Sequence, residues 1–264
     1  MYPYLFNNEH LPMYGIMFML GITVSLLFSF LVASKKSKVK KEDLLYGACF
    51  ALVGGILGAK LLSILTSIDT IIEYHISFID VIKNGFVFYG GLLGGALGYF
   101  IYAKVYKIPF FDMTDNAVQS LPLGHCFGRI GCFCAGCCYG KETNSFLGVV
   151  FTHPADPYCP VGVKILPTQL FEAGFCLLLF ITILIVRIKF KDIKSGILTL
   201  IYILSYGIFR FILEFFRGDE ARRSFLFFST SQWISLLLVL FGIGCLIFKI
   251  YQNKYKNNRN LAVK

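Results

Sequence analysis

Residues 112–130, DMTDNAVQSLPLGHCFGRI, decide the fold, because the stretches around them are far more apolar. The stretch has the length of a membrane-spanning helix, yet it contains two aspartates, a histidine and an arginine. Such side chains are too costly to face lipid, so a helix here would be buried among others or line a wet cavity. Whether this stretch crosses the membrane determines the number of spans and the side on which each loop lies.

The rest of the sequence has the composition of an integral membrane protein. Of its 264 residues, 56% are hydrophobic and 15% charged, and the mean hydropathy is +0.69, whereas soluble domains have roughly 25% charged residues. Stretches of about 20 mostly apolar residues, the length of a span, occur at residues 13–34, 44–66, 86–106, 167–187, 196–216 and 229–250. We expect one polytopic membrane domain over residues 1–264, with an outer tail at 1–12 and a basic cytoplasmic tail at 251–264.

The placement of basic residues supports a crossing by residues 112–130. Sixteen of the 25 lysines and arginines follow the first, third, fifth and seventh stretches, and the positive-inside rule places all of them in the cytoplasm only if the weak stretch spans. They are Lys35, Lys36, Lys38, Lys40, Lys41, Lys104, Lys107, Arg187, Lys189, Lys191, Lys194, Lys249, Lys254, Lys256, Arg259 and Lys264. The predicted fold is therefore an all-α membrane protein with seven transmembrane helices, the N-terminus outside and the C-terminus in the cytoplasm.

Neither a nucleic-acid partner nor a removable signal peptide is expected. The net charge of +10 does not indicate a nucleic-acid partner, because the basic residues cluster at the ends of apolar stretches. The first apolar stretch has neither a preceding basic region nor a small-residue cleavage site, so we expect it to remain as a membrane helix.

Glycines such as Gly54, Gly58 and Gly94 recur within the helices, where they are expected to allow close packing in lipid.

Two arginines fall within predicted spans. Arg129 ends the weak stretch, and Arg210 lies well inside the sixth span. Tyr206, Arg210 and Glu214 share one helical face at a spacing of four, and Arg217 is predicted to continue that face. An uncompensated arginine costs at least ~2.5–3.5 kcal/mol at the centre of a membrane helix, so these side chains require partners.

Two explanations of these arginines remain open. Arg210 could be neutralised by Glu214, with Glu172 and Asp115 as further buried partners. Alternatively, two arginines on different helices suit a phosphate, whose oxygens accept charge-assisted, bidentate hydrogen bonds. The second explanation predicts a site for a phospholipid headgroup near Arg129 and Arg210.

A series of short motifs follows the chain from its first span to its last. One motif is Gly128-Arg129-Ile130-Gly131, continuing to Gly136 and Gly140. The others are Tyr14-Gly15, Gly90-Gly91-Leu-Leu-Gly94, Asp115, Pro167-Thr168-Gln169-Leu170-Phe171-Glu172, the stretch from Tyr206 to Arg217, and Ser231-Gln232. Together they resemble the pattern of the bacterial prolipoprotein diacylglyceryl transferase family, which implies a seven-helix fold with an outer N-terminus.

The resemblance implies transfer of the diacylglyceryl group of phosphatidylglycerol to the thiol of a lipobox cysteine in a secreted prolipoprotein, releasing glycerol 1-phosphate. It also implies a location in the bacterial cytoplasmic membrane, with membrane lipid and the prolipoprotein as partners and no cofactor. The implied catalytic residues are Arg129, Arg210 and Tyr89. The implied substrate-binding residues are Tyr14, Asp115, Gly131, Gly140, Glu172, Tyr206, Glu214 and Arg217.

Three positions depart from the family pattern. Tyr89 stands in place of a histidine, and Cys132 and Cys137 stand in place of an asparagine and a glutamate. Tyrosine is a poorer base than histidine at neutral pH, so these departures bear on how the acceptor thiol loses its proton. We expect Tyr89 to act as an orienting hydrogen-bond donor.

The nine cysteines of the chain are concentrated near Arg129. Those of the cluster are Cys126, Cys132, Cys134, Cys137 and Cys138. They could be small apolar packing residues, or one of them could form a disulfide with Cys159 in an oxidising compartment. Cys134-x2-Cys137 supplies one pair of zinc ligands and His125 could complete a site, but a second pair is not evident, so no metal is expected. His125 is expected to be structural.

A reactive thiol near Arg129 is a further possibility, with Cys132, Cys134, Cys137 and Cys138 as candidates. Two alternatives to the transferase function therefore remain. The chain could bind lipid without turning it over, or it could be a thiol-based transferase or redox protein with a different acceptor.

Overall fold

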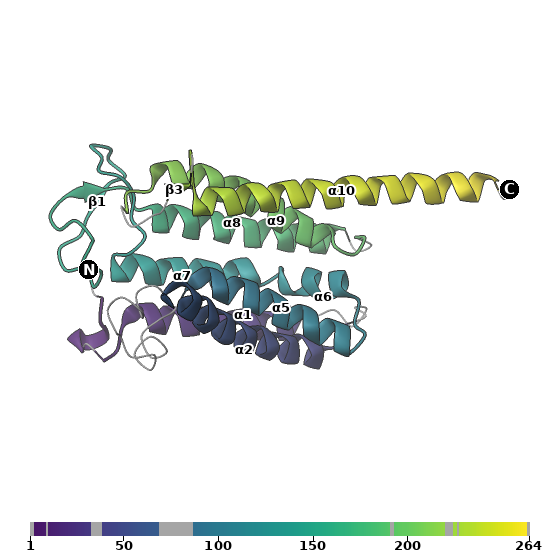
Figure 1. Cartoon of the computed structure of the whole chain (residues 1–264), viewed down its shortest axis with the longest axis horizontal. Helices are drawn as coiled ribbons and strands as arrows, with labels where there is room; N and C mark the ends of the chain where they lie inside the picture. Colours follow the sequence, from purple (N-terminus) through teal and green to yellow (C-terminus); the bar gives the residue numbers. More distant parts are fainter. Residues whose placement is uncertain are drawn as a thin grey trace. The chain divides into compact units, whose positions relative to one another are not determined.

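The computed structural model describes residues 3–8, 10–32, 39–68, 87–190, 193–219, 224–225 and 227–262. These residues are mostly helical, with two small pairs of strands and a long non-helical connection between residues 135 and 168 (Figure 1). The α-helices are α1 (Met13–Val32), α2 (Lys41–Thr66), α5 (Phe88–Val105), α6 (Phe110–Ala117), α7 (Leu121–Ala135), α8 (Thr168–Lys189), α9 (Ile197–Leu213) and α10 (Thr230–Ala262). The shorter elements are the 3-10 helices η1 (Leu5–Asn7) and η2 (Glu214–Phe216) and the strands β1 (Val149–Val150), β2 (Lys164–Ile165), β3 (Ser224–Phe225) and β4 (Phe228–Ser229).

Five of the described helices are long and apolar enough to cross a membrane: α1, α2, α8, α9 extended by η2, and α10. They coincide with five of the predicted apolar stretches, which confirms a helical membrane protein. The predicted stretch 86–106 forms α5, and α10 continues through most of the basic tail. Among the basic residues on which the topology was argued, those outside the described residues are Lys35, Lys36, Lys38, Lys191 and Lys264.

Residues 112–130 do not form the single helix that their length suggested. Helix α6 ends at Ala117 and α7 begins at Leu121, with turns between them. Pro122 lies in the first turn of α7, where a backbone N–H has no partner within the helix. In a continuous helix this proline would remove a hydrogen bond and clash with the preceding turn. The stretch in which a fourth span was expected therefore contains two helices, and its crossing of the membrane stays a prediction.

The described helices form two compact units, one of residues 26–117 and the other of residues 1–25 and 118–264. In the first unit, α2 lies along α5 (Figure 1). A Cβ atom at Gly58 would lie 2.3 Å from the carbonyl oxygen of Gly90, and one at Gly94 would lie 2.2 Å from that of Gly54. Only glycine permits this approach, which confirms the predicted glycine-mediated packing. The single-domain organisation stays a prediction.

In the second unit, α8 packs against both α7 and α9, and α9 packs against α10 (Figure 1). Leu179, Ile183 and Leu198 are buried between α8 and α9. The first half of α1 approaches α7 closely, since a Cβ atom at Gly21 would lie 2.8 Å from the carbonyl oxygen of Gly124. The neighbouring helices α7, α8 and α9 carry Arg129, Glu172 and Arg210, respectively.

The loop between α7 and α8 has a small core of its own. Strands β1 and β2 pair antiparallel, and Tyr139, Phe151, Cys159 and Ile165 are buried together. All nine cysteines lie in the described part of the chain and are free, so the possible disulfide of Cys159 is not formed. Burial in this cluster raises the pKa of the Cys159 thiol to about 11.

Candidate active site

Helix α7 presents His125 and Arg129 on one face, because residues four apart are neighbours on a helix. Arg129 Nε donates a hydrogen bond to His125 Nε2 at 3.3 Å. The His125 ring also packs against the ring of Tyr206 on α9, with centroids 5.1 Å apart. A ring nitrogen that accepts a hydrogen bond carries no proton, so His125 is neutral in this arrangement, with its proton on Nδ1.

Glu172 on α8 connects the polar groups of α7 and α9. Its side chain is fully buried, and Oε1 accepts a hydrogen bond from the Tyr206 hydroxyl at 2.7 Å and pairs with Arg129 Nη2 at 3.1 Å. The other oxygen, Oε2, lies 3.8 Å from Nη1 of Arg210. His125 Nε2 lies 3.6 Å from Oε1, which is too far for a hydrogen bond. One buried carboxylate thus orients both arginines that were predicted to be catalytic.

Arg210 has further partners beyond Glu172. Its Nη2 pairs with Oε2 of Glu214 at 2.9 Å and donates to Oγ of Ser231 at 3.4 Å. Ser229 Oγ donates to the other oxygen of Glu214 at 2.8 Å. The Ser231-Gln232 motif at the start of α10 therefore lies at this network, as Gln232 Oε1 accepts a hydrogen bond from the Ser229 backbone N–H.

The two arginines and two glutamates of this network balance in formal charge. The Arg210–Glu214 pair is the one expected if Arg210 were only neutralised within its own helix. The network contains more than this pair, because Glu172 also contacts Arg210 and connects it to Arg129 on another helix. In addition, Arg210 Nη1 is buried and makes no hydrogen bond among the described residues, its ion-pair partner Glu172 Oε2 lying 3.8 Å away. A buried charged donor left in this way costs at least about 1–3 kcal/mol, and an anionic oxygen would satisfy it.

Arg217 does not continue the polar face of α9, contrary to the prediction. The α-helix ends at Leu213 and tightens into η2, after which Arg217 has extended backbone. Its guanidinium binds Asp219 through two hydrogen bonds, from Nε at 3.0 Å and from Nη2 at 2.8 Å. Burial opposes the charge of Arg217, but Asp219 and Cys138 together outweigh burial and raise its pKa.

The loop after α7 is held by side chains from the start of α8. Gly136 ends α7 with a left-handed backbone, φ 80°, as glycine commonly does at this position. Thr168 Oγ1 donates to the carbonyl oxygen of Cys138 at 2.9 Å, and Gln169 Nε2 donates to that of Cys137 at 2.8 Å. Both donors are fully buried. The Pro167-Thr168-Gln169 motif therefore positions the cysteine-containing loop.

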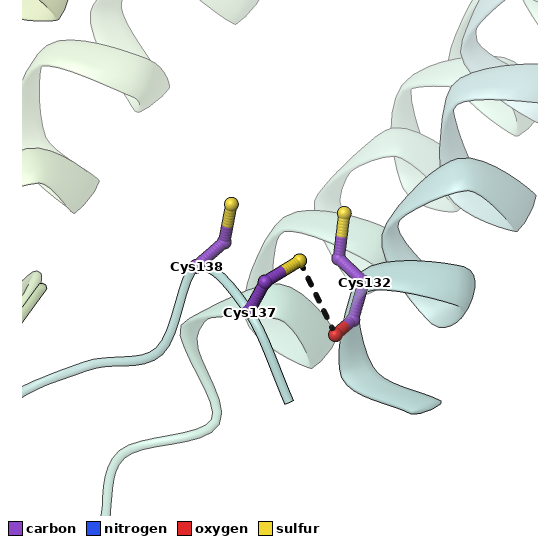
Figure 2. A group of neighbouring side chains, drawn as sticks. All are labelled: Cys132, Cys137 and Cys138. Atoms are coloured by element: carbon purple, nitrogen blue, oxygen red, sulfur yellow. Dashed lines mark hydrogen bonds between the residues drawn. The ribbon is translucent and has the colours of Figure 1, made fainter. Parts of the chain in front are cut away.

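The structure brings together Cys132, Cys137 and Cys138 but not Cys134. The three sulfur atoms lie within 4.8 Å of one another, between the end of α7 and the loop after it (Figure 2). Cys137 Sγ donates to the carbonyl oxygen of Cys132 at 3.7 Å (Figure 2). The neighbouring Cys132 and Cys137 thiols lower the pKa of the Cys138 thiol, and the nearby Arg217 adds to this effect. Hydrogen bonding with Cys132 and Cys138 raises the pKa of the Cys137 thiol.

Gly131 and Gly140 allow two close approaches of the backbone. A Cβ atom at Gly131 would lie 3.2 Å from the carbonyl oxygen of Tyr14 on α1. One at Gly140 would lie 2.7 Å from the carbonyl oxygen of Leu166 and 2.8 Å from that of Phe216. Packing therefore accounts for glycine at both positions. The substrate-binding roles predicted for these glycines and for the partly exposed Tyr14 stay predictions.

Two predicted site residues belong to the other unit. Tyr89 lies in the first turn of α5, and the buried Asp115 lies in α6. The catalytic role predicted for Tyr89 and the binding role predicted for Asp115 stay predictions.

The prediction from sequence did not identify His125 as a site residue. The sequence feature that could have identified it is its spacing. His125, Arg129 and Cys132 lie four and three residues apart and therefore share one face of α7. Thr168 and Gln169 belonged to a recognised motif, but their hydrogen bonds to the loop carbonyls could not be deduced from it.

These features define a helical membrane protein with a buried arginine–carboxylate network, built on three neighbouring helices beside a cysteine-rich loop. A family model described as prolipoprotein diacylglyceryl transferase matches residues 3–248. The chain belongs to this family, as its motifs predicted.

Similar proteins occur in several bacteria. A phosphatidylglycerol–prolipoprotein diacylglyceryl transferase of Clostridium tetani is 39% identical over 246 residues, covering 92% of this chain and 96% of the relative. The protein named phosphatidylglycerol–prolipoprotein diacylglyceryl transferase 2 of Clostridium perfringens is 37% identical over 251 residues, covering 95% and 94%. A transferase of the same name from Chlorobaculum tepidum is 37% identical over 168 residues, covering 62% and 56%.

Proposed function

We propose that this protein transfers the diacylglyceryl group of phosphatidylglycerol to the acceptor cysteine thiol of a prolipoprotein. Its membership of the transferase family and the names of its relatives support this pair of substrates. The structural observation that carries the proposal is the buried Glu172, which holds Arg129 of α7 and Arg210 of α9 in one network.

In the reaction, the acceptor sulfur forms a bond to a glycerol carbon of phosphatidylglycerol. The bond between that carbon and the phosphate oxygen breaks, and the oxygen leaves with both electrons as part of glycerol 1-phosphate. Negative charge therefore grows on the phosphate in the transition state. Arg129 and Arg210 supply charged donors that Glu172 holds in place beforehand, which is how enzymes stabilise developing charge most effectively.

His125 supports the removal of the thiol proton. Because its Nε2 accepts a hydrogen bond from Arg129, the imidazole is neutral, and Nε2 would take up the thiol proton once Arg129 turns to the lipid phosphate and releases this bond. In this chain Tyr89 on α5 replaces the histidine of the family. His125 on α7 would supply the base instead. Tyr89 then acts as an orienting donor.

The proposal includes the seven-span topology in the bacterial cytoplasmic membrane, with the N-terminus outside. Five apolar helices, together with α5 and the pair α6 and α7, would supply the seven crossings. A broken helix is tolerated at membrane depth where it is buried in protein or lines a wet cavity. The positive-inside rule supports the orientation.

A vesicle assay tests the function. Purified protein is incubated with phosphatidylglycerol vesicles and a synthetic peptide containing a lipobox cysteine, and the thioether-linked diacylglyceryl peptide is measured by mass spectrometry. We expect product with the cysteine peptide and none when serine replaces the acceptor. Phosphatidylglycerol that copurifies with the protein, without any product, would instead support a lipid-binding module. Product formation would exclude that alternative.

A further inference from the structure

The three clustered cysteines have the geometry of a metal-binding site. Zinc binds cysteine sulfur at about 2.3 Å in a tetrahedral arrangement, which separates neighbouring sulfur atoms by about 3.8 Å. The sulfur atoms of Cys132, Cys137 and Cys138 already lie within 4.8 Å of one another. Small rotations of the side chains would bring all three onto one ion.

The backbone that carries these thiols is held in an unusual conformation. Cys138 has φ 64°, a left-handed value that residues with a Cβ atom rarely adopt. The buried Thr168 and Gln169 bind the carbonyl oxygens of Cys138 and Cys137 and so support this conformation. These bonds fix the backbone from which Cys137 and Cys138 extend, and fixed ligand positions favour metal binding.

Nearby charges also suit a thiolate-bound ion. Three thiolates and one divalent cation carry a net charge of −1. Arg129 and Arg217 both interact electrostatically with Cys138, and Arg129 also with Cys132. Both guanidiniums are also paired with carboxylates, Arg129 with Glu172 and Arg217 with Asp219, so they reduce the cost of this negative charge without cancelling it.

The number of ligands distinguishes the kind of site. Among the described residues, the group of potential ligands contains only these three, and Cys134 and Cys159 do not belong to it. Structural zinc sites have four protein ligands, whereas catalytic sites have three and leave one position for water or substrate. Cys137 and Cys138 are partly exposed, so an incoming group could reach the ion.

We propose that Cys132, Cys137 and Cys138 bind one zinc ion, and that the acceptor thiol of the prolipoprotein occupies the fourth position. The second half of this proposal rests on the transferase function proposed above. Cys132 lies one turn beyond Arg129 on the same face of α7. The acceptor thiol would thus bind beside the arginine that faces the lipid phosphate.

The chemistry balances without any oxidant or reductant. When it binds zinc as a thiolate, the acceptor thiol gives up its proton, which the neutral His125 takes up. The thiolate sulfur then donates its electron pair to the glycerol carbon, and the phosphate oxygen departs with the electrons of the broken carbon–oxygen bond. Zinc keeps its charge throughout and releases the thioether product, which is a weaker ligand than a thiolate.

Metal content tests the site itself. The protein is purified in detergent with added zinc chloride, desalted and analysed for metals by mass spectrometry. We expect about one zinc ion per chain, its loss in Cys137→Ser, and its retention in Cys137→His, which keeps a zinc ligand. Cys134→Ser is the matched control and should retain zinc. Wild-type protein without zinc, or a Cys137–Cys138 or Cys132–Cys137 disulfide found by peptide mapping, would overturn the proposal.

Cobalt substitution tests the fourth position. Cobalt bound by thiolates in tetrahedral geometry absorbs visible light, and the spectrum changes with its ligands. Addition of the lipobox peptide should change the spectrum, and the peptide with serine in place of the acceptor cysteine should not. An identical response to both peptides would refute binding of the acceptor thiol.

The two proposals fail in different ways. If the protein forms lipidated peptide at an undiminished rate after a zinc chelator has removed all metal, the proposed binding of the acceptor thiol by zinc is wrong and the transferase function stands. If zinc binds as expected but no lipidated peptide is formed, the transferase function is wrong and the metal site stands.

Discussion

Replacing Glu172 with glutamine tests whether this carboxylate holds the two arginines. The change preserves the size of the side chain and an acceptor for the Tyr206 hydroxyl, but it removes the charge that faces Arg129 at 3.1 Å and Arg210 at 3.8 Å. Only Glu214 would then compensate the two buried guanidiniums within this network.

The expected effect follows from the burial of the pair. Glu172 is completely buried, so solvent does not screen the loss. Removing one partner of a buried ion pair destabilises a protein by about 3–5 kcal/mol. Loss of preorganised donors at a developing charge lowers kcat by about 10²–10³-fold. We therefore expect Glu172→Gln to lower both thermal stability and kcat in the vesicle assay.

The matched control is Glu142→Gln, which removes the same charge from an exposed position in the loop after α7. Exposed charges contribute little to stability, so this variant should behave like the wild type. Thermal unfolding is followed by the fluorescence of Trp233, the one tryptophan of the chain. Activity of Glu172→Gln within twofold of the Glu142→Gln value would refute the assignment of Glu172 as the group that positions both arginines.

Three further predictions concern other parts of the site. His125→Gln should lower kcat by about 10²-fold or more while leaving KM for phosphatidylglycerol nearly unchanged, because it removes the base and not the arginines; an unchanged kcat would exclude His125 as the base. Gly140→Ala should destabilise the protein by about 1–3 kcal/mol, since its Cβ would lie 2.7 and 2.8 Å from two carbonyl oxygens. Gly174→Ala, which meets nothing within 4 Å, should be neutral or stabilising in the same thermal assay. Tyr89→Phe should lower activity modestly and Tyr89→His should be tolerated; complete loss of activity in both variants would contradict an orienting role.

The helical membrane fold could be predicted from the sequence because its signals are local. A span of about 20 apolar residues is visible in the sequence without any knowledge of its neighbours. The same holds for the glycines that line the contact of α2 and α5, since small residues at helical spacing indicate close packing in lipid. The division of residues 112–130 into α6 and α7 was the missed element, although Pro122 marked the position where a helix begins.

The polar network depends on contacts between helices that are far apart in the chain. Spacing placed Tyr206, Arg210 and Glu214 on one face of α9, and the structure has the Arg210–Glu214 pair. The link from Glu172 to Arg129 joins α8 to α7, and no periodicity within one helix could predict it. For Arg217, spacing within one helix gave a wrong prediction. The helix ends before this position, and Asp219 is the partner of Arg217.

By itself, the sequence determined the membrane-embedded class, the family and the identity of the two arginines, because apolar length, helical spacing and short motifs are properties of contiguous residues. Only the tertiary structure decided that Glu172 connects those arginines, that His125 joins them, and that Cys132 rather than Cys134 meets Cys137 and Cys138. The physical reason is that side-chain contacts across helices depend on the ends, rotation and packing of each helix. A left-handed residue at Gly136 and buried hydrogen bonds from Thr168 and Gln169 turn the loop back toward the end of α7.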